Sequence, residues 1–305
     1  LLLSRLSEHK GLINSLGIET IDLPIKRSSR NPFRELKTIY FIFDVISNFK
    51  PDLVQAVAMK PVLYTALSTI FVNTNGRIFA FGGLGFIFRS NKTIARTLRL
   101  FFIPIFRLLL RGKNIRLIIQ NKDDRKLLED YRVVDEKKIR LIRGAGVDTM
   151  KFVSQSTSHS DKLLVILPAR MLWDKGVEDF VICAKRCQNK KVNARFVLIG
   201  DPDPHNPECI PDSQLKKWIE QGAIEWWERR DDILSAYHKA DIVCFPSYHE
   251  GLPKALLEAA SCGLPIVSYD VPGCREVVQD NINGFLIPFK DIDALFSAVL
   301  KLLED

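Results

Sequence analysis

The sequence lacks any apolar run long enough to cross a membrane. The longest candidate, Leu100 to Leu110, has 11 residues and is interrupted by Pro104 and Arg107, whereas a spanning helix needs about 20 apolar residues. Low-complexity segments and internal repeats are absent too, which excludes disordered and fibrous classes. With 47% hydrophobic and 26% charged residues, the composition is that of an ordinary globular protein.

Cysteine is present, but without the spacing of a metal site. None of the six cysteines forms a CxxC pair, all lie in the second half of the chain, and most sit inside apolar runs. They are Cys183, Cys187, Cys209, Cys244, Cys262 and Cys274. We therefore expect reduced thiols inside a core, in preference to disulfide bridges or a metal site.

Acidic residues are scarce in the first half, and the net charge of +8 conceals this asymmetry. Residues 1–150 contain 26 Lys and Arg against 13 Asp and Glu, a net charge of +13, whereas residues 151–305 contain 18 against 23, a net charge of −5. The two halves are therefore expected to face different partners.

The length and the apolar pattern predict two α/β domains. A chain of 305 residues suggests two domains at roughly 150 residues each. Short apolar, β-rich runs alternate with amphipathic stretches on both sides of a polar segment at 153–162, which is typical of doubly wound parallel sheets. We predict an N-terminal domain over 1–152, a linker over 153–162 and a C-terminal domain over 163–305.

The predicted strands form two series. The first series is 53–57, 77–81, 115–120 and 139–142. The second series is 163–167, 194–199, 223–227, 242–245, 265–269 and 284–288. Residues 1–17 are predicted to be the tail of a helix before a strand at 18–23, and 291–305 an amphipathic helix without a cap. We therefore expect the fold to be truncated at both ends.

The richest segment is PSYHEGLPKALLEAASCG, residues 246–263, which follows a predicted strand. Pro253 suits a first helical turn and Gly263 a left-handed helix end. A loop containing Gly251 thus leads into a helix N-terminus at the carboxyl end of a strand, where anions bind.

Glu250 and Glu258 are about 12 Å and about 80° apart on an ideal helix, so they cannot share a proton. They suit two separated parts of one extended ligand, such as the sugar and the ribose of a nucleotide sugar. The alternative is a solvated Glu250 and a Glu258 on the face of a helix.

Several ordered motifs resemble one enzyme family. EGLPKALLEAASCGLPIV carries a Glu-x7-Glu spacing, LPARMLWDKGV (167–177) an Arg-x4-Lys-Gly pattern, and GAGVD (144–148) a Gly-x-Gly-Val-Asp pattern. With VPGCREVV and NGFLIP, these resemble the family 4 retaining glycosyltransferases, and the resemblance covers the chain from about residue 20 onward. It implies the GT-B fold, in which two Rossmann-like domains face a cleft.

Shorter segments resemble one group of enzymes within this family. This group comprises bacterial α-1,3-N-acetylgalactosaminyltransferases that act on undecaprenyl-diphosphate-linked glycans. The segments that carry the similarity are KRSSRNPF, QAVAMKP, FGGLGFIF and EWWERRDDI. This resemblance implies a UDP-sugar donor, with an N-acetylhexosamine as the sugar, and a lipid-linked glycan acceptor.

The family motifs also imply the roles of residues. Glu250, Arg170 and Lys175 are implied as catalytic. The implied donor-binding residues are Glu258, Gly251, Leu252, Gly200 and Asp201. Negative charge grows on the β-phosphate as the sugar leaves, and fixed cations stabilise that charge most in the transition state.

With Arg and Lys available, no metal or other cofactor is expected. Metal binding by Asp201 with Asp203 is the less favoured alternative, and Asp291 with Asp293 suits helix capping.

The acceptor side is less explicit. Gly82, Gly83 and Gly85 follow a predicted strand, where a ligand can approach the backbone closely, although a tight turn is an equal alternative. Lys60 is predicted to reach an acceptor phosphate. Met59 stands where close relatives often carry a histidine, so no acceptor-side histidine is expected here.

The segment from Arg89 to Arg116 contains eight cations and no acid, interleaved with apolar and aromatic residues. This pattern favours an interfacial segment on an anionic membrane, with membrane-facing residues Arg96, Arg99, Phe102 and Arg107. The alternative is a core helix with a solvated basic face. Nucleic-acid binding is not expected, because no nucleic-acid motif accompanies the charge.

Together these patterns predict a retaining glycosyltransferase in surface polysaccharide or glycoprotein glycan synthesis, located in the cytoplasm on the inner membrane. A glycosyltransferase with a soluble acceptor, or a non-catalytic nucleotide-sugar-binding protein, remains an alternative.

Overall fold

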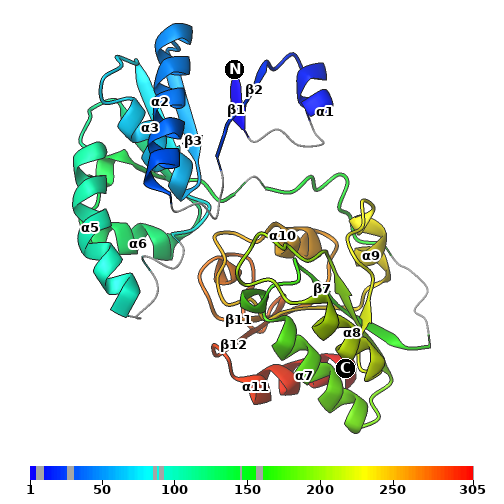
Figure 1. The fold of residues 1–305 in the computed structure, drawn as a ribbon. Coiled ribbons are helices and arrows are strands. Elements are labelled where there is room, and N and C mark those ends of the chain that lie inside the picture. Colours follow the sequence, from blue (N-terminus) through cyan, green and yellow to red (C-terminus); the bar gives the residue numbers. More distant parts are fainter. Residues whose placement is uncertain are drawn as a thin grey trace.

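The computed structural model describes residues 1–4, 10–25, 31–84, 88, 93–144, 146–155 and 161–304. Its strands form parallel sheets of two, four and six strands. The four-stranded sheet belongs to the N-terminal half and the six-stranded sheet to the C-terminal half, each surrounded by helices (Figure 1). The predicted α/β class, with a main parallel sheet in each half, is therefore confirmed.

The N-terminal half is built on four strands in spatial order β3-β4-β5-β6. They are β3 (Leu53–Val57), β4 (Gly76–Ala80), β5 (Ile115–Ile119) and β6 (Ile139–Leu141), with helices α2 (Pro32–Phe49), α3 (Met59–Ser68), α5 (Thr93–Leu109) and α6 (Lys122–Asp130). Strand β5 buries Ile115, Leu117 and Ile119 completely. Two residues later, the side chain of Asn121 accepts a hydrogen bond from the backbone N–H of Asp124 and caps α6.

The first residues differ from the prediction. Residues 2–4 form strand β1 (Leu2–Ser4), which pairs in parallel with β2 (Thr20–Asp22), and helix α1 (Lys10–Ser15) lies between them. The predicted helix over 1–17 is therefore wrong in its first residues, and the predicted strand over 18–23 is shorter. Three residues are too few for apolar periodicity to distinguish a strand from a helix.

The C-terminal sheet has the order β12-β11-β10-β7-β8-β9. Its strands are β7 (Leu163–Pro168), β8 (Ala194–Ile199), β9 (Glu225–Trp226), β10 (Ile242–Phe245), β11 (Ile266–Tyr269) and β12 (Gly284–Ile287). Its helices are α7 (Val177–Asn189), α8 (Asp212–Glu220), α9 (Ile233–Lys239), α10 (Lys254–Ser261) and α11 (Ile292–Glu304). Strands β10 and β11 are buried along their whole length, as expected for a parallel sheet covered on both faces.

Each half has its own apolar core. One cluster joins α3, α5, β4 and β5, and a separate, larger cluster joins β7, β8, β10 and β11 with their helices. In the C-terminal half α11 packs against α7. The end of the chain lies on the side of that half that faces away from the N-terminal half (Figure 1). No described helix has both the length and the apolar character needed to span a membrane.

Candidate functional site

The residues implied as donor-binding meet at one edge of the C-terminal sheet. Strands β10, β7 and β8 are neighbours and run parallel. Arg170 follows β7, Gly200 follows β8, and Glu250 follows β10. Because carboxyl ends of parallel strands lie at the same edge, segments far apart in the sequence are brought together here.

Lys175 and Glu250 form the more buried of two charged pairs at this edge. Lys175 Nζ lies 2.7 Å from Glu250 Oε1, and the side chains are only 15% and 13% exposed. Ser247 Oγ donates to the same carboxylate oxygen at 2.8 Å. The approach depends on Gly176, which has a φ of +69° and whose Cβ, if present, would lie 1.9 Å from the carbonyl oxygen of Pro246. The Lys-Gly pair in the motif thus has a steric reason.

A buried carboxylate holds this loop in place. Tyr248 Oη donates to Asp179 Oδ2 at 3.0 Å, and Tyr269 Oη donates to the same oxygen at 2.8 Å. Burial first, and Asp179 next, raise the pKa of both phenols, so both remain donors. Since Asp179 stands four residues after Lys175 and Tyr248 two before Glu250, this contact keeps that pair together. We did not predict it from sequence, because an acid in a first helical turn is already explained by the helix dipole.

Arg170 lies in a second charged pair. Its Nη1 donates to Asp203 Oδ2 at 2.7 Å, and its side chain is half exposed. Asp201 Oδ1 accepts from the backbone N–H of Arg229 at 2.8 Å. The loops after β7 and β8 touch at Gly200, where a Cβ would lie 2.1 Å from the carbonyl oxygen of Ala169. Asp201 thus holds a loop, while Asp203 balances the charge of Arg170.

Glu258 has a different environment from Glu250. It is 7% exposed on α10, where Tyr237 Oη donates to its Oε2 at 3.1 Å and Lys254 Nζ lies 3.2 Å from its Oε1. Burial, followed by the Glu258 charge, raises the pKa of Tyr237 well above its usual value. The two glutamates therefore have separate partners, as their spacing requires.

On the N-terminal side, the glycine loop after β4 meets the donor loop. A Cβ on Gly251 would lie 1.7 Å from the carbonyl oxygen of Gly82, and one on Gly83 would lie 3.6 Å from Gly251 Cα. Gly144 lies against Leu252, since a Cβ added to Gly144 would lie 2.9 Å from Leu252 Cδ2. Gly85 lies outside the described residues.

The placement of Lys60 differs from the simple prediction of a side chain free to reach a phosphate. Lys60 Nζ lies 2.9 Å from Glu35 Oε1 on α2. The same carboxylate accepts a hydrogen bond from Tyr64 Oη. An acceptor phosphate would therefore compete with Glu35 for this cation.

The basic segment corrects part of the membrane prediction. Arg99 is 9% exposed and donates to the carbonyl oxygen of Phe88 and to Tyr131 Oη, so it does not face outward. Phe102 packs against the core and stacks on Phe106. Arg107 lies on the surface, but its guanidinium donates to two carbonyl oxygens at the end of α6. Arg96 is exposed.

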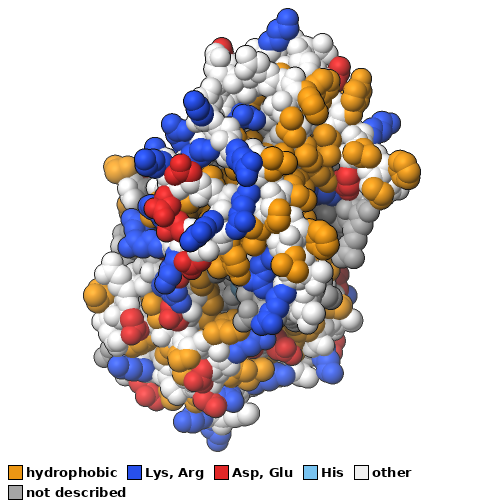
Figure 2. All heavy atoms as spheres, turned by 90° about the vertical axis from the view of Figure 1, so that its left-hand side faces the viewer, with side chains coloured by type: hydrophobic (Ala, Val, Ile, Leu, Met, Phe, Trp, Pro, Cys, Tyr) orange, Lys and Arg blue, Asp and Glu red, His pale blue; other side chains and the backbone are white. Residues whose placement is uncertain are grey.

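The outward face of α5 is apolar instead. It exposes Leu100 (75%), Phe101 (65%) and Leu108 (65%). Figure 2 shows hydrophobic side chains gathered on the N-terminal half, with Lys and Arg beside them.

The geometry can support chemistry on a diphosphate. Two cations, Arg170 and Lys175, stand at one sheet edge, each held by an acid. The start of α10 follows the same loop. Positioned cations and a helix N-terminus both favour negative charge that develops on a leaving group.

Comparisons with known proteins show what this chain is similar to. Residues 162–305 match the family model "Glycosyl transferases group 1". The chain is 28% identical, over 98% of its length and 80% of the relative, to N,N'-diacetylbacillosaminyl-diphospho-undecaprenol alpha-1,3-N-acetylgalactosaminyltransferase from Campylobacter jejuni. It is 26% identical, over 89% of its length and 71% of the relative, to UDP-Gal:alpha-D-GlcNAc-diphosphoundecaprenol alpha-1,3-galactosyltransferase from Escherichia coli.

The fold agrees with these similarities. The structure of a glycosyltransferase from Rickettsia africae matches 99% of this chain and 79% of that protein, with a TM-score of 0.74 and 20% identity. Residues 162–305 thus match a glycosyltransferase group 1 domain, and the chain as a whole has the GT-B fold.

Proposed function

We propose that the chain is a retaining glycosyltransferase that moves a sugar, an N-acetylhexosamine, from a UDP-sugar to a lipid-linked glycan acceptor. The observation that carries this proposal is the meeting of Arg170, Lys175 and Glu250 at the edge of the C-terminal sheet. The names of the two relatives support it, since both act on sugars linked to undecaprenyl diphosphate and one uses a UDP-sugar.

In this proposal the C-terminal half holds the donor. Arg170 and Lys175 exchange their acidic partners for the diphosphate, and stabilise the charge that grows on the β-phosphate as the sugar leaves. Glu258 accepts hydrogen bonds from the ribose hydroxyls, and Glu250 faces the sugar. The backbone at Gly251 and Leu252 lines the sugar pocket. A phosphate leaving group needs little protonation, so we propose no metal and no other cofactor.

The N-terminal half is proposed to hold the acceptor, with Lys60 and Gly83 on that side. Its exposed apolar residues on α5, together with Arg96, suit a membrane surface that carries anionic lipid. The chain would then act as a peripheral protein on the cytoplasmic face of the inner membrane.

The direct test is a panel of UDP- and GDP-sugars with an undecaprenyl-diphosphate-linked acceptor, in which the anomeric configuration of the product is read by NMR. We expect transfer from a UDP-N-acetylhexosamine with retained configuration and without added metal. Binding of UDP without transfer from any donor would favour the non-catalytic alternative. Equal transfer to a short soluble acceptor, without sedimentation on anionic liposomes, would favour a soluble acceptor.

The two glutamates provide a second test within the same half. Glu258→Ala should weaken binding of free UDP in calorimetry, because the variant loses the ribose contact. Glu250→Ala should keep most of that affinity and lower turnover. Glu220→Ala, on the exposed face of α8, is the matched control and should change neither quantity. Equal losses of UDP affinity at both sites would contradict the assignment.

A further inference from the structure

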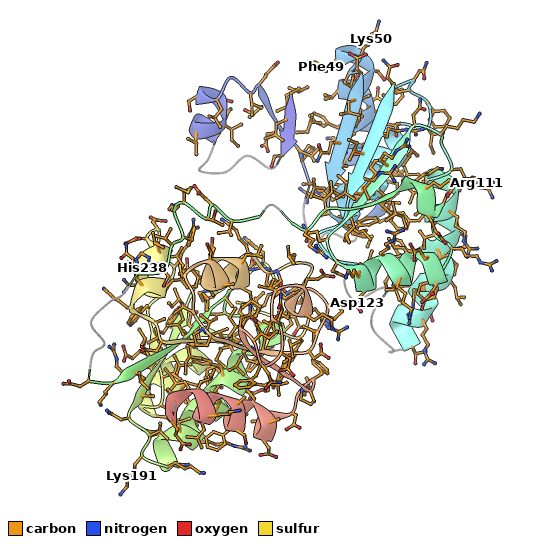
Figure 3. The ribbon with its side chains drawn as sticks, turned by 180° about the vertical axis from the view of Figure 1, so that it is seen from behind. Phe49, Lys50, Arg111, Asp123, Lys191 and His238 are labelled. Atoms are coloured by element: carbon orange, nitrogen blue, oxygen red, sulfur yellow. The ribbon has the colours of Figure 1, made fainter. Side chains whose placement is uncertain are left out.

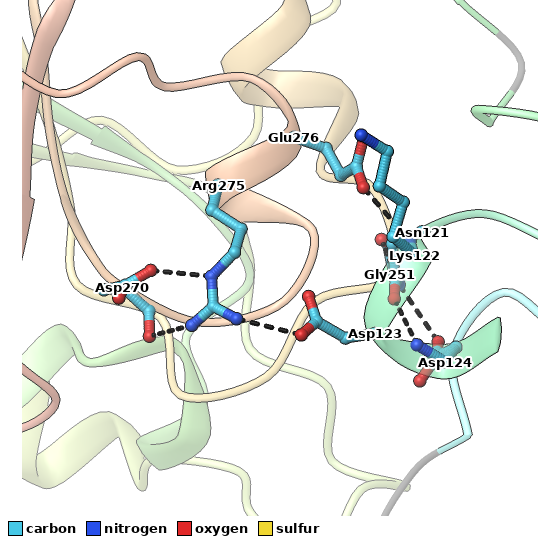
Figure 4. Close-up of polar contacts among 8 residues, drawn as sticks. All are labelled: Asn121, Lys122, Asp123, Asp124, Gly251, Asp270, Arg275 and Glu276. Atoms are coloured by element: carbon cyan, nitrogen blue, oxygen red, sulfur yellow. Dashed lines mark hydrogen bonds and ion pairs between the residues drawn. The ribbon is translucent and has the colours of Figure 1, made fainter. Parts of the chain in front are cut away.

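Several consecutive residues at the start of α6 form polar contacts with the C-terminal half, beside the contact between Gly82 and Gly251 described above. Asn121, Lys122 and Asp123 all contact the C-terminal half. Figure 3 places Asp123 at the boundary between the halves, whereas Arg111 lies on the outer side of the N-terminal half. The contacts on the C-terminal side come from Gly251 and from Arg275 and Glu276 of the 3-10 helix η3 (Cys274–Glu276) (Figure 4).

The central contact is made by a buried carboxamide. Asn121 is fully buried, and its Nδ2 donates to the carbonyl oxygen of Gly251 at 2.8 Å. The same Nδ2 donates to Asp124 Oδ2 at 3.0 Å, while Oδ1 accepts from the Asp124 N–H at 2.7 Å. Both amide protons are therefore used. Because the cap fixes Oδ1, the amide group cannot rotate without losing its bond to α6.

Gly251 is the position at which such a contact affects the site. It follows Glu250, which is paired with Lys175. Its peptide is enclosed by backbone on both sides, since a Cβ would lie 1.7 Å from the carbonyl oxygen of Gly82 and the carbonyl oxygen of Gly251 lies 2.6 Å from a Cβ on Gly273. A hydrogen bond to this carbonyl therefore sets the orientation of the peptide that joins Gly251 to Leu252.

Further polar contacts cross the boundary beside Asn121. Arg275 Nη1 lies 2.9 Å from Asp123 Oδ1, with both side chains more than a third exposed. Glu276 accepts from the Lys122 N–H at 3.1 Å and from Arg143 Nε at 2.9 Å. The exposed Arg275–Asp123 pair therefore contributes little in water. The Glu276 side chain is only 8% exposed, but none of these contacts involves the Gly251 peptide.

We propose that Asn121 is a positioning residue for the donor loop: its carboxamide reaches across the boundary and holds the Gly251 carbonyl, so that Glu250 and Leu252 reach working geometry only when the halves are together. The inference rests on the proposed function, because it assigns Asn121 to the proposed donor site. If the halves separated, the hydrogen bond between the buried amide of Asn121 and the Gly251 carbonyl would be lost. Because losing it costs free energy, contact between the halves is coupled to the order of this loop.

The test uses Asn121→Ser, because serine caps a helix about as well as asparagine but lacks the second donor. In hydrogen exchange without nucleotide, we expect faster exchange in peptides covering 246–256 and unchanged exchange in 122–130. Turnover should fall at least about tenfold, because small misplacements of a reacting group are costly, while the calorimetric affinity for UDP changes by less than about twofold.

Asn31→Ser is the matched control for the loss of a capping asparagine, since Asn31 caps α2 through the Phe33 N–H. It should leave exchange at 246–256 unchanged. Arg275→Gln should change turnover by less than about threefold, as expected for an exposed pair.

The proposal is overturned if exchange at 246–256 is the same in Asn121→Ser and the parent, or if α6 and the whole N-terminal half exchange faster in parallel, which would indicate a folding defect only. Failure of the proposed function has a separate signature, a parent protein that neither binds UDP nor transfers sugar. The exchange comparison uses no substrate, so it decides the role of Asn121 in the loop in either case.

Discussion

The two halves are built from the same strand and helix units, but they differ in where apolar side chains lie. Among the described residues, only four of the exposed large hydrophobic side chains lie after residue 152: Val153, Ile219, Ile282 and Phe289. The N-terminal half exposes many more, including Phe33 (82%), Phe71 (84%) and Phe101 (65%). It also carries the excess of positive charge, +13 against −5.

This difference separates two uses of an α/β scaffold. The C-terminal half places its apolar residues in one large core and its charged residues at the sheet edge, where Lys175 and Glu250 meet. The N-terminal half has a smaller core and leaves apolar and basic residues on its surface. Exposed apolar area of this kind marks a binding surface. Catalysis and attachment are thus expected to respond to substitutions in different halves.

The largest effect should come from a cavity in either core. Leu117→Ala in β5 and Leu295→Ala in α11 each remove a side chain that is fully buried, and each should cost about 2–5 kcal/mol of unfolding free energy. All four tryptophans, Trp173, Trp218, Trp226 and Trp227, lie in the C-terminal half. Urea unfolding followed by tryptophan fluorescence should therefore shift for Leu295→Ala and not for Leu117→Ala, while far-UV circular dichroism detects both. An equal fluorescence shift for the two variants would mean that the halves unfold as one unit.

A smaller effect is expected on turnover. Lys175→Ala should cost on the order of 3 kcal/mol of transition-state stabilisation, or about a hundredfold in rate. Lys190→Ala, at the other end of α7, serves as the control because its Nζ lies over the ring of Phe296 on α11. Steady-state transfer assays with a saturating donor would measure this difference. A Lys175→Ala enzyme with parental turnover would contradict a role for this cation at the β-phosphate.

Much of this arrangement was predictable from sequence, because continuous apolar runs mark buried strands. The run at 194–199 coincides with β8, and the Lys-Gly and Glu-Gly motifs lie where their loops meet. Contacts between distant segments were not predictable. Tyr248 and Tyr269 reach Asp179 across 69 and 90 residues of sequence, and Asn121 reaches Gly251 across 130. No local pattern encodes such pairings.

The error at the basic segment has a different origin. Composition alone does not give the helical phase of this segment. Arg99, Phe102 and Phe106 are spaced by three and four residues, which places them on one face of a helix, and that face turns toward the core. Leu100, Phe101 and Leu108 lie on the opposite face and are exposed. The helical period of this segment therefore separates the buried residues from the exposed ones.

Alkaline pH should destabilise the C-terminal half through its buried thiols. Burial raises the pKa of the Cys274 thiol from its usual 9.0 to about 12, so the folded thiol keeps its proton while the unfolded one ionises. Stability is therefore complete below pH 9 and falls between about pH 9 and about pH 12, with a slope of up to about 1.4 kcal/mol per pH unit for each such thiol. The N-terminal half has no cysteine. Urea midpoints from tryptophan fluorescence at about pH 8 and about pH 10 should thus differ more for the parent than for Cys274→Ala. Equal differences would show that this thiol does not contribute.

The smallest expected effect separates two neighbouring arginines of α5. Arg96 is exposed, and one cation near an anionic surface contributes about 1 kcal/mol, or about fivefold in binding. Arg96→Ala should therefore weaken sedimentation with anionic liposomes at low salt and leave stability unchanged. Arg99 donates to the carbonyl oxygen of Phe88 and to Tyr131 Oη, so Arg99→Ala should lower the unfolding midpoint seen by circular dichroism. Its affinity for liposomes, measured on folded protein, should stay at the parental value, because a buried cation cannot approach the lipid. If Arg96→Ala binds the vesicles as tightly as the parent, α5 is a core helix with a solvated basic face, and the exposed apolar residues of the N-terminal half need a partner other than the membrane.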